Sequence, residues 1–394
     1  MNTLNTRDKN ALEILERLIS FDTTSHLSNM KLIDYVQGFL KSHGIDSELI
    51  HDDEDPLKAN LYATIGPADT PGVMLSGHTD VVPIDGQDWS SDPFIMRDAG
   101  DTVFGRGTSD MKGFIAVCLA MVPEFVNANL KTPIHLAFSY DEETGCTGVR
   151  GLIRMLNIAP VKPRMCIVGE PTSMNVIVGH KGTVSFDIHV RGFEIHSSLA
   201  PSGVNAVEYA ARMIAFLSDE HRKRIKNGPF EDGFDVQHST VHVGTVQGGT
   251  AQNIVPRDCY FSLEMRYIPT EDVDAFKATI EAKMAELTAE MQAIQPDTGI
   301  SIARTAGTPG LNMDPNEEVV TLVKQLAGKN EHSRVAFATE AGLFQQWGNI
   351  PSVICGPGSI EQAHKPNEFI SKSELAKCGV FMDKLLERLI QGLG

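Results

Sequence analysis

The sequence contains few cysteines, and none of them are paired at the spacing of a thiolate metal site. Six cysteines are scattered over 394 residues, and no Cys-x-x-Cys motif occurs. In a chain of this size, this pattern is typical of reduced thiols in a cytoplasmic protein. We therefore expect a cytoplasmic location.

Long hydrophobic runs and excess positive charge are also absent. No stretch is long and apolar enough to span a membrane, and the first ten residues lack the apolar core of a secretory signal. The chain has 34 Lys and Arg against 51 Asp and Glu, a formal net charge of -17. Nucleic acid and anionic membranes are therefore not expected as partners. A small anionic substrate remains compatible, because one buried arginine can outweigh a distant acidic surface.

Short apolar strands alternate with amphipathic helices through much of the chain. We predict strands at 60–65, 73–76, 134–139, 165–168 and 352–355, and helices at 11–19, 32–43, 113–122 and 149–156. Such alternation indicates an α/β fold, with a mostly parallel sheet covered by helices on both faces.

A different pattern occupies residues 182–305. We predict strands at 184–190, 239–246, 259–267 and 300–304, and helices at 204–217 and 271–291. The order β-α-β-β-α-β is that of a ferredoxin-like α+β domain. We therefore expect this domain to be inserted into a catalytic domain formed by residues 1–181 and 306–394.

His78 and Asp80 form the most informative motif. They follow a short apolar run, 73–76, that predicts a buried strand. Open α/β sheets bind their ligands beyond the carboxyl ends of strands. A metal-bound imidazole usually donates its second ring N–H to a carboxylate. His78 is therefore a candidate metal ligand, and Asp80 is the candidate group that orients it.

Carboxylates occur in three further segments of this kind. Asp110 lies in a glycine-rich turn before a helix, where an ordinary helix N-cap is the alternative. Glu142 and Glu143 follow a strand. If both carboxylates are buried, they repel each other. A metal bound to one of them relieves this repulsion and leaves the other as a general base. The alternative for this pair is a solvated acidic turn. Glu170 follows a strand and a glycine, and its alternative is an ordinary strand-end glutamate.

His364 lies on a loop rich in glycine and proline that follows the last predicted strand, and a surface histidine is its alternative. Five candidate ligands at strand ends of one sheet are harder to dismiss than any one alone. Histidine and carboxylate without thiolate suit zinc, manganese or cobalt. One bridging carboxylate shared by two ligand sets would form a two-metal centre. We expect two divalent ions, with zinc as the first choice.

With these motifs the chain resembles the M20 metallopeptidase/deacylase family over nearly its whole length, including the insert. The resemblance implies a role for each residue: His78 and Glu170 on one metal, Glu143 and His364 on the second, Asp110 as the bridge, Asp80 as the partner of His78, and Glu142 as the general base. The residues alone did not decide which glutamate is the base.

Two segments of the insert also match the family. Segment 192–198 resembles its lid histidine motif, which implies that His196 stabilises the oxyanion, reaching the neighbouring subunit of a homodimer. Segment 248–257 resembles its substrate-gripping segment, with Asn253 and Arg257 as candidates. Arg257 suits a forked grip on an α-carboxylate, although a surface salt bridge is the alternative.

Three more residues are expected to line the substrate region: Lys181, Thr339 and Glu340. Within the family, the segments 178–182, 338–342 and 356–364 favour N2-acetyl-L-ornithine as substrate. The expected reaction gives acetate and L-ornithine in arginine biosynthesis, as water bridging the two metals loses its proton to the general base.

Other functions remain open at this stage. The nearest are succinyl-diaminopimelate desuccinylase and other N-acyl-amino-acid deacylases or dipeptidases of the same family. A non-catalytic metal-binding protein would be marked by the loss of the general base or a ligand, and none is missing. A purely structural homodimer would show no metal dependence.

Overall fold

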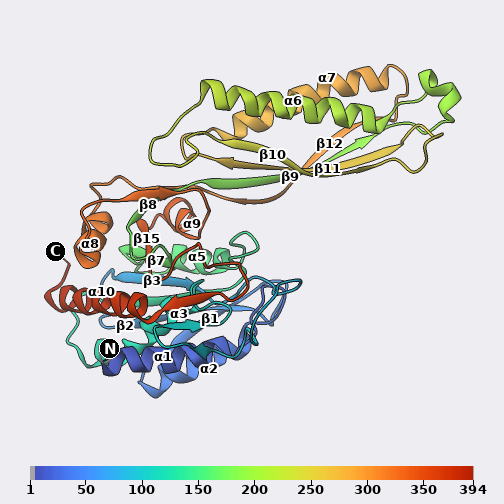
Figure 1. Cartoon of the computed structure of the whole chain (residues 1–394). Coiled ribbons are helices and arrows are strands. Elements are labelled where there is room, and N and C mark those ends of the chain that lie inside the picture. Colours follow the sequence, from blue (N-terminus) through green and yellow to red (C-terminus); the bar gives the residue numbers. More distant parts are fainter. Residues whose placement is uncertain (1–4, 394) are drawn as a thin grey trace. The chain divides into compact units, whose positions relative to one another are not determined.

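The computed structural model describes residues 5–393, which form two compact units (Figure 1). The first unit contains residues 5–179, 311–334 and 339–393, and the second contains 180–310 and 335–338. The sequence-based division placed the insert at 182–305. Within residues 5–393, no helix is both long enough and apolar enough to cross a membrane.

The first unit is built on a mixed sheet with strand order β1-β2-β6-β3-β7-β15-β8-β13, and β14 pairs with β8. The strands are β1 (Ser47–His51), β2 (Ala59–Ile65), β3 (Val73–His78), β6 (Ile134–Ser139), β7 (Met165–Pro171), β8 (Ile177–His180), β13 (Leu311–Asn312), β14 (Ser333–Val335) and β15 (Ser352–Gly356). Parallel pairing joins the four central strands, β6, β3, β7 and β15. Antiparallel strands extend the sheet from both ends of this parallel core, at β2 and at β8.

Helices cover both faces of this sheet, with α2 and α3 on one face and α5 and α9 on the other (Figure 1). The helices of the first unit are α1 (Thr6–Ile19), α2 (Met30–Ser42), α3 (Lys112–Ala120), α4 (Val122–Asn127), α5 (Val149–Ile158), α8 (Glu318–Ala327), α9 (Ala341–Gln346) and α10 (Lys372–Gln391). A small antiparallel sheet adds β4 (Arg97–Asp98), β5 (Thr102–Phe104) and β16 (Phe369–Ser371). The predicted α/β fold is confirmed.

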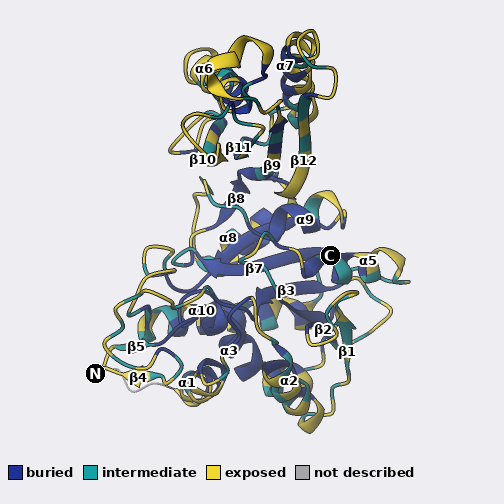
Figure 2. Ribbon diagram, turned by 90° about the vertical axis from the view of Figure 1, so that its right-hand side faces the viewer, coloured by how far each residue is buried: buried dark blue, intermediate teal, exposed yellow. Residues whose placement is uncertain are grey.

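The central strands are apolar because both of their faces are covered. Every residue of β3, β6, β7 and β15 is buried, and β3 and β7 are dark blue along their length in Figure 2. Strands buried on both faces have continuous apolar runs instead of alternation. Because these four strands are parallel to one another, their carboxyl ends all lie at one edge of the sheet. The polar residues that follow these strands are brought together there.

The second unit has the β-α-β-β-α-β order of a ferredoxin-like domain. Its elements are β9 (Gly182–Arg191), a 3-10 turn (Ser197–Ser202), α6 (Ala206–Asn227), β10 (Thr240–Gly248), β11 (Asp258–Tyr267), α7 (Val273–Gln292) and β12 (Gly299–Thr308). The strands pair antiparallel in the order β10-β11-β9-β12. Alternate residues of β9, including Phe186 and Ile188, are buried in one hydrophobic core with residues of α6 and α7.

Candidate metal centre

His78 ends β3 and is 1 % exposed. Its Nδ1 lies 2.9 Å from the main-chain oxygen of Asp80, so this nitrogen carries the proton and donates it. The second ring nitrogen, Nε2, is then the one that can offer its lone pair to a cation. It faces Asp110 Oδ1 at 3.1 Å and Glu170 Oε1 at 4.0 Å. Three potential ligand atoms therefore converge on one point, from the ends of β3 and β7 and from the turn before α3.

A second group meets the other oxygen of Asp110. His364 Nε2 lies 3.0 Å from Glu143 Oε2 and 3.4 Å from Asp110 Oδ2. In each group of three residues, one ligand atom from each lies within 4.8 Å of the others. Asp110 belongs to both groups, so the five predicted ligands form two sets that share one carboxylate. This is the arrangement that a bridging carboxylate requires.

The chemistry of the two groups suits cations. Glu170 Oε1 is buried and has no hydrogen-bond partner among the described residues. Burial and the neighbouring carboxylates of Asp110 and Glu142 raise the pKa of Glu170 well above its usual value. Hydrogen bonds to Asp110 and Glu143 raise the pKa of His364 to about 10. Both shifts mean that these side chains bind a proton more tightly than usual, as expected of groups arranged around a positive charge. Histidine and carboxylate ligands without thiolate fit zinc, manganese or cobalt.

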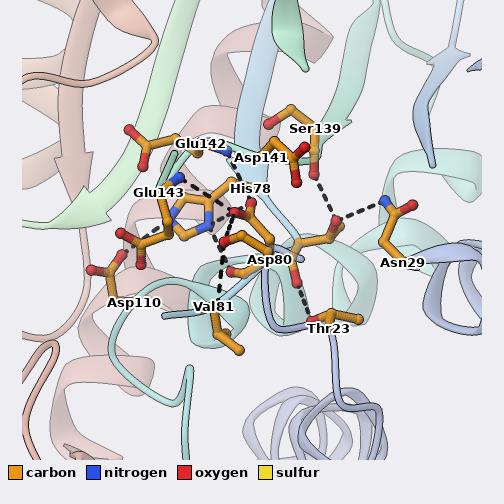
Figure 3. Close-up of polar contacts among 12 residues, drawn as sticks. Thr23, Asn29, His78, Asp80, Val81, Asp110, Ser139, Asp141, Glu142 and Glu143 are labelled. Carbon is orange, nitrogen blue, oxygen red and sulfur yellow. Dashed lines mark hydrogen bonds and ion pairs between the residues drawn. The ribbon is translucent and has the colours of Figure 1, made fainter. Parts of the chain in front are cut away.

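Asp80 connects His78 to the segment that carries Glu142 and Glu143 (Figure 3). Its Oδ1 accepts the N–H of Glu142 at 3.1 Å, and its Oδ2 accepts the N–H of Glu143 at 3.3 Å and the hydroxyl of Ser25 at 2.7 Å. Although burial opposes ionisation, the contact with His78 and the bond from Ser25 hold the pKa of Asp80 below its usual value. Asp80 therefore positions His78 through its main-chain oxygen, with its carboxylate 3.5 Å from Nδ1, and holds the main chain of Glu142 and Glu143 through that carboxylate.

Replacing Asp80 with asparagine should lower both metal affinity and activity about 10- to 100-fold. The asparagine side chain would place an NH2 group where a carboxylate oxygen now accepts hydrogen bonds from Glu142, Glu143 and Ser25, so at least one of these bonds would be lost. Metal titration of the depleted protein and steady-state kinetics measure the two effects. Asp314→Asn is a matched control, because Asp314 accepts two hydrogen bonds from Asn316 and belongs to neither ligand group. Wild-type metal affinity in Asp80→Asn would contradict the positioning role.

Glu142 lies beside both groups and belongs to neither. Its Oε1 accepts a hydrogen bond from Cys146 Sγ at 3.3 Å. Burial, with the nearby carboxylates of Glu143 and Glu340, raises the pKa of Glu142 well above its usual value. A carboxylate with increased proton affinity next to a candidate metal site has the properties of a general base.

Glu368 was not predicted from the sequence, although it holds the Asp110 turn in place. Its Oε1 accepts the N–H groups of Ser109 at 2.8 Å and Asp110 at 3.0 Å. Its Oε2 accepts the N–H of Gly107 and Arg106 Nη1, both at 2.9 Å. Arg106 and Glu368 are each 1 % exposed. The only sequence signal is its position four residues after His364, and that spacing does not indicate a partner 258 residues away.

The candidates from the insert lie in the second unit. His196 and Asn253 are neighbours, because the N–H of Ser197 donates to Asn253 O at 2.9 Å and His196 forms a β-bridge with Ile254. Arg257 is exposed, and its Nε donates to Asp258 Oδ2 at 2.8 Å. In this structure Arg257 therefore forms the surface ion pair that was the alternative to its substrate role.

Lys181, Thr339 and Glu340, the three residues predicted to line the substrate region, are all buried, with at most 2 % exposure. Lys181 Nζ donates to the main-chain oxygen of His238 at 2.7 Å. Thr339 Oγ1 accepts the N–H of Ala341, the first residue of α9. Burial raises the pKa of Glu340 to about 7. The structure places these side chains in polar contacts inside the protein.

Comparisons with known proteins show what the chain is similar to. The model of peptidase family M20/M25/M40 matches residues 74–388. The chain is 32% identical to the acetylornithine deacetylase of Proteus mirabilis, over 93% of this chain and 92% of that protein.

Two solved structures share the fold. An M20 family metallo-carboxypeptidase from Sulfolobus solfataricus has a TM-score of 0.76 at 19% identity, covering 98% of this chain and 99% of that one. A dinuclear metal-binding peptidase of family M20 from Bacillus subtilis has a TM-score of 0.68 at 15% identity, with the same coverage.

Proposed function

The chain belongs to peptidase family M20/M25/M40, and from this premise we propose that it hydrolyses the amide bond of N2-acetyl-L-ornithine. Membership makes it a metal-dependent hydrolase of the peptidase/deacylase type. The observation that carries the proposal is the pair of ligand groups that share Asp110, with the carboxylate of Glu142 beside them.

The metal ions would be held by these two groups. His78 and Glu170 would bind one ion, Glu143 and His364 the other, and Asp110 both. When bound, the ions act as Lewis acids that lower the pKa of water and polarise the acyl carbonyl. We propose zinc as the metal, with cobalt or manganese as alternatives, because the donors are imidazole and carboxylate.

Glu142 would then carry the proton. Its carboxylate accepts a proton from the attacking water as the water oxygen bonds to the acyl carbon. It returns the proton to the amide nitrogen as the C–N bond breaks, so one water is consumed and one carboxylic acid and one amine are released. Asp80 assists by holding the main chain at 142 and 143 while it orients His78.

Three residues of the second unit have proposed roles in the reaction. We propose that His196 stabilises the oxyanion and that Asn253 and Arg257 hold the amino-acid end of the substrate. Arg257 would exchange its bond with Asp258 for the substrate carboxylate. Homodimerisation through this unit and a cytoplasmic location stay predictions from the sequence.

The likeness to acetylornithine deacetylase, at 32% identity over 93% of the chain, supports the acetyl-ornithine substrate. Amine release should be measured with N2-acetyl-L-ornithine, N-succinyl-diaminopimelate and a dipeptide, using metal-depleted protein before and after zinc or cobalt is restored. We expect metal-dependent release with the acetyl compound as the preferred substrate. A preference for the succinyl compound or the dipeptide would keep the chemistry and contradict the substrate. No release from any of the three by metal-loaded protein would contradict the proposed function.

A further inference from the structure

A cavity of about 1000 Å³ lies in the first unit, away from the metal ligands. Its walls come from the last turn of α8, the exposed side of α10 and the turns around Gly100 and Ser173. None of the five candidate ligands, nor Glu142, lines it. A space of this size matches the pockets that hold small organic molecules.

The inner wall of the cavity is apolar. Met174, Leu326 and Phe381 line it and are at most 4 % exposed, so they form a fixed surface at its base. Val380 lines the outer part of the cavity and is 49 % exposed. An apolar body in the cavity would bury the exposed part of Val380, and the already buried base would offer it van der Waals contact.

The rim of the cavity is mainly basic, with one carboxylate, that of Asp101, against several lysines. Lysines at four positions line it: Lys329, Lys372, Lys377 and Lys384.

Two of these lysines are neutralised within the protein. Lys372 pairs with Asp98 at 2.7 Å, and Lys377 pairs with Glu374 at 2.6 Å. Lys384 Nζ instead donates to the main-chain oxygen of Leu326 at 3.1 Å.

The other two lysines keep their charge available. Within residues 5–393, neither Lys329 nor Lys384 has a carboxylate within ion-pair distance. Both line the same cavity, and a Cβ placed on Gly328, the residue before Lys329, would lie 3.9 Å from Lys384 Nζ. Two uncompensated ammonium groups beside an apolar wall are notable in a chain whose net charge is -17, and such a pair favours an anion.

We propose that this cavity binds an amphipathic anion, with its apolar body against Met174, Leu326 and Phe381 and its single acidic group at Lys329 and Lys384. Carboxylate and phosphate share the required chemistry. The binding depends on both parts of the ligand, because an exposed ion pair alone contributes little free energy. The site is separate from the metal centre and does not require the proposed catalytic function.

Calorimetry on the intact, metal-loaded protein tests this proposal with octanoate, octyl phosphate, octan-1-ol and octylammonium as probes. We expect both anions to bind, and octan-1-ol and octylammonium to bind at least about tenfold more weakly, a difference of about 1.4 kcal/mol. Tighter binding of octanoate would identify a carboxylate as the preferred group, and tighter binding of octyl phosphate a phosphate.

Two variants locate the binding. Lys329→Glu should weaken octanoate about tenfold or more, and Val380→Trp, which fills the cavity without changing charge, should weaken it as well. Lys226→Glu is the matched control, because it makes the same charge change at an exposed position of α6 in the second unit. Three results would overturn the proposal: no binding of either anion, equal binding of octan-1-ol, or octanoate binding that survives both cavity variants and is lost when the metals are removed.

Discussion

Replacing Glu142 with glutamine should lower kcat about 100- to 10,000-fold while metal content and thermal stability stay near wild type. Glutamine keeps the shape of the side chain but cannot accept the proton of the attacking water. Glu142 belongs to neither ligand group, so both ions should remain. Single-turnover and steady-state rates, measured beside the metal content of the same sample, test this expectation.

Glu143→Gln provides the contrast, because it changes the adjacent residue in the same way. Glu143 lies 3.0 Å from His364 and belongs to the second ligand group. This variant should lose bound metal, and its activity should recover in part when excess metal is added. Glu142→Gln should not recover in this way. A fully active Glu142→Gln enzyme would contradict the assignment of the base.

Replacing Glu368 with alanine should destabilise the protein by about 3–5 kcal/mol. Arg106, 1 % exposed, would keep its charge without its carboxylate partner. The N–H groups of Gly107, Ser109 and Asp110 would lose their acceptor. Urea unfolding of metal-free protein measures the effect separately from metal binding. The turn that presents Asp110 should also loosen, so metal affinity should fall.

Glu318→Ala is the control for this prediction. Glu318 pairs with Arg164 at 2.7 Å in the same unit, but both side chains are at least 35 % exposed. An exposed pair contributes at most about 1 kcal/mol, so this variant should unfold close to wild type. If Glu368→Ala costs no more than Glu318→Ala, then Glu368 is not the structural support of the Asp110 turn.

The sequence was most informative where local pattern and burial agree. The runs beginning at Val73 and Met165 are mostly apolar because β3 and β7 are buried on both faces, and each leads to a charged or metal-binding residue type. Parallel neighbours bring such residues to one edge of a sheet. His78 and Glu170 could therefore be selected as candidates before the structure was known, and the structure places them 4.0 Å apart.

Long-range partners and helix ends could not be predicted in this way. Glu368 contacts the Asp110 turn only through tertiary folding, and one sequence contains no record of that pairing. Helix α6 was expected to end at Leu217, where the apolar pattern stops, but it continues to Asn227. Its last turns are charged and are held by ion pairs, such as that between Arg224 and Glu271, from outside the helix.

The sheet was likewise predicted only in part: its central strands were predicted, and several strands at its two sides were not. The strands β8, β13 and β14, at one side of the sheet, are two to four residues long, too short for a sequence pattern to mark. Arg257, 2.8 Å from Asp258, forms the surface ion pair that the sequence allowed as the alternative to a substrate role.

The most direct test is the number of metal ions that each chain binds, measured by native mass spectrometry after depletion and reloading with zinc. Two groups of three ligands that share Asp110 predict two ions in the wild type. Glu170→Ala and His364→Ala should each retain one ion, since each removes a ligand from one group only. Asp110→Ala should bind less metal than either. A single ion in the wild type, or two ions in all three variants, would contradict the two-metal centre.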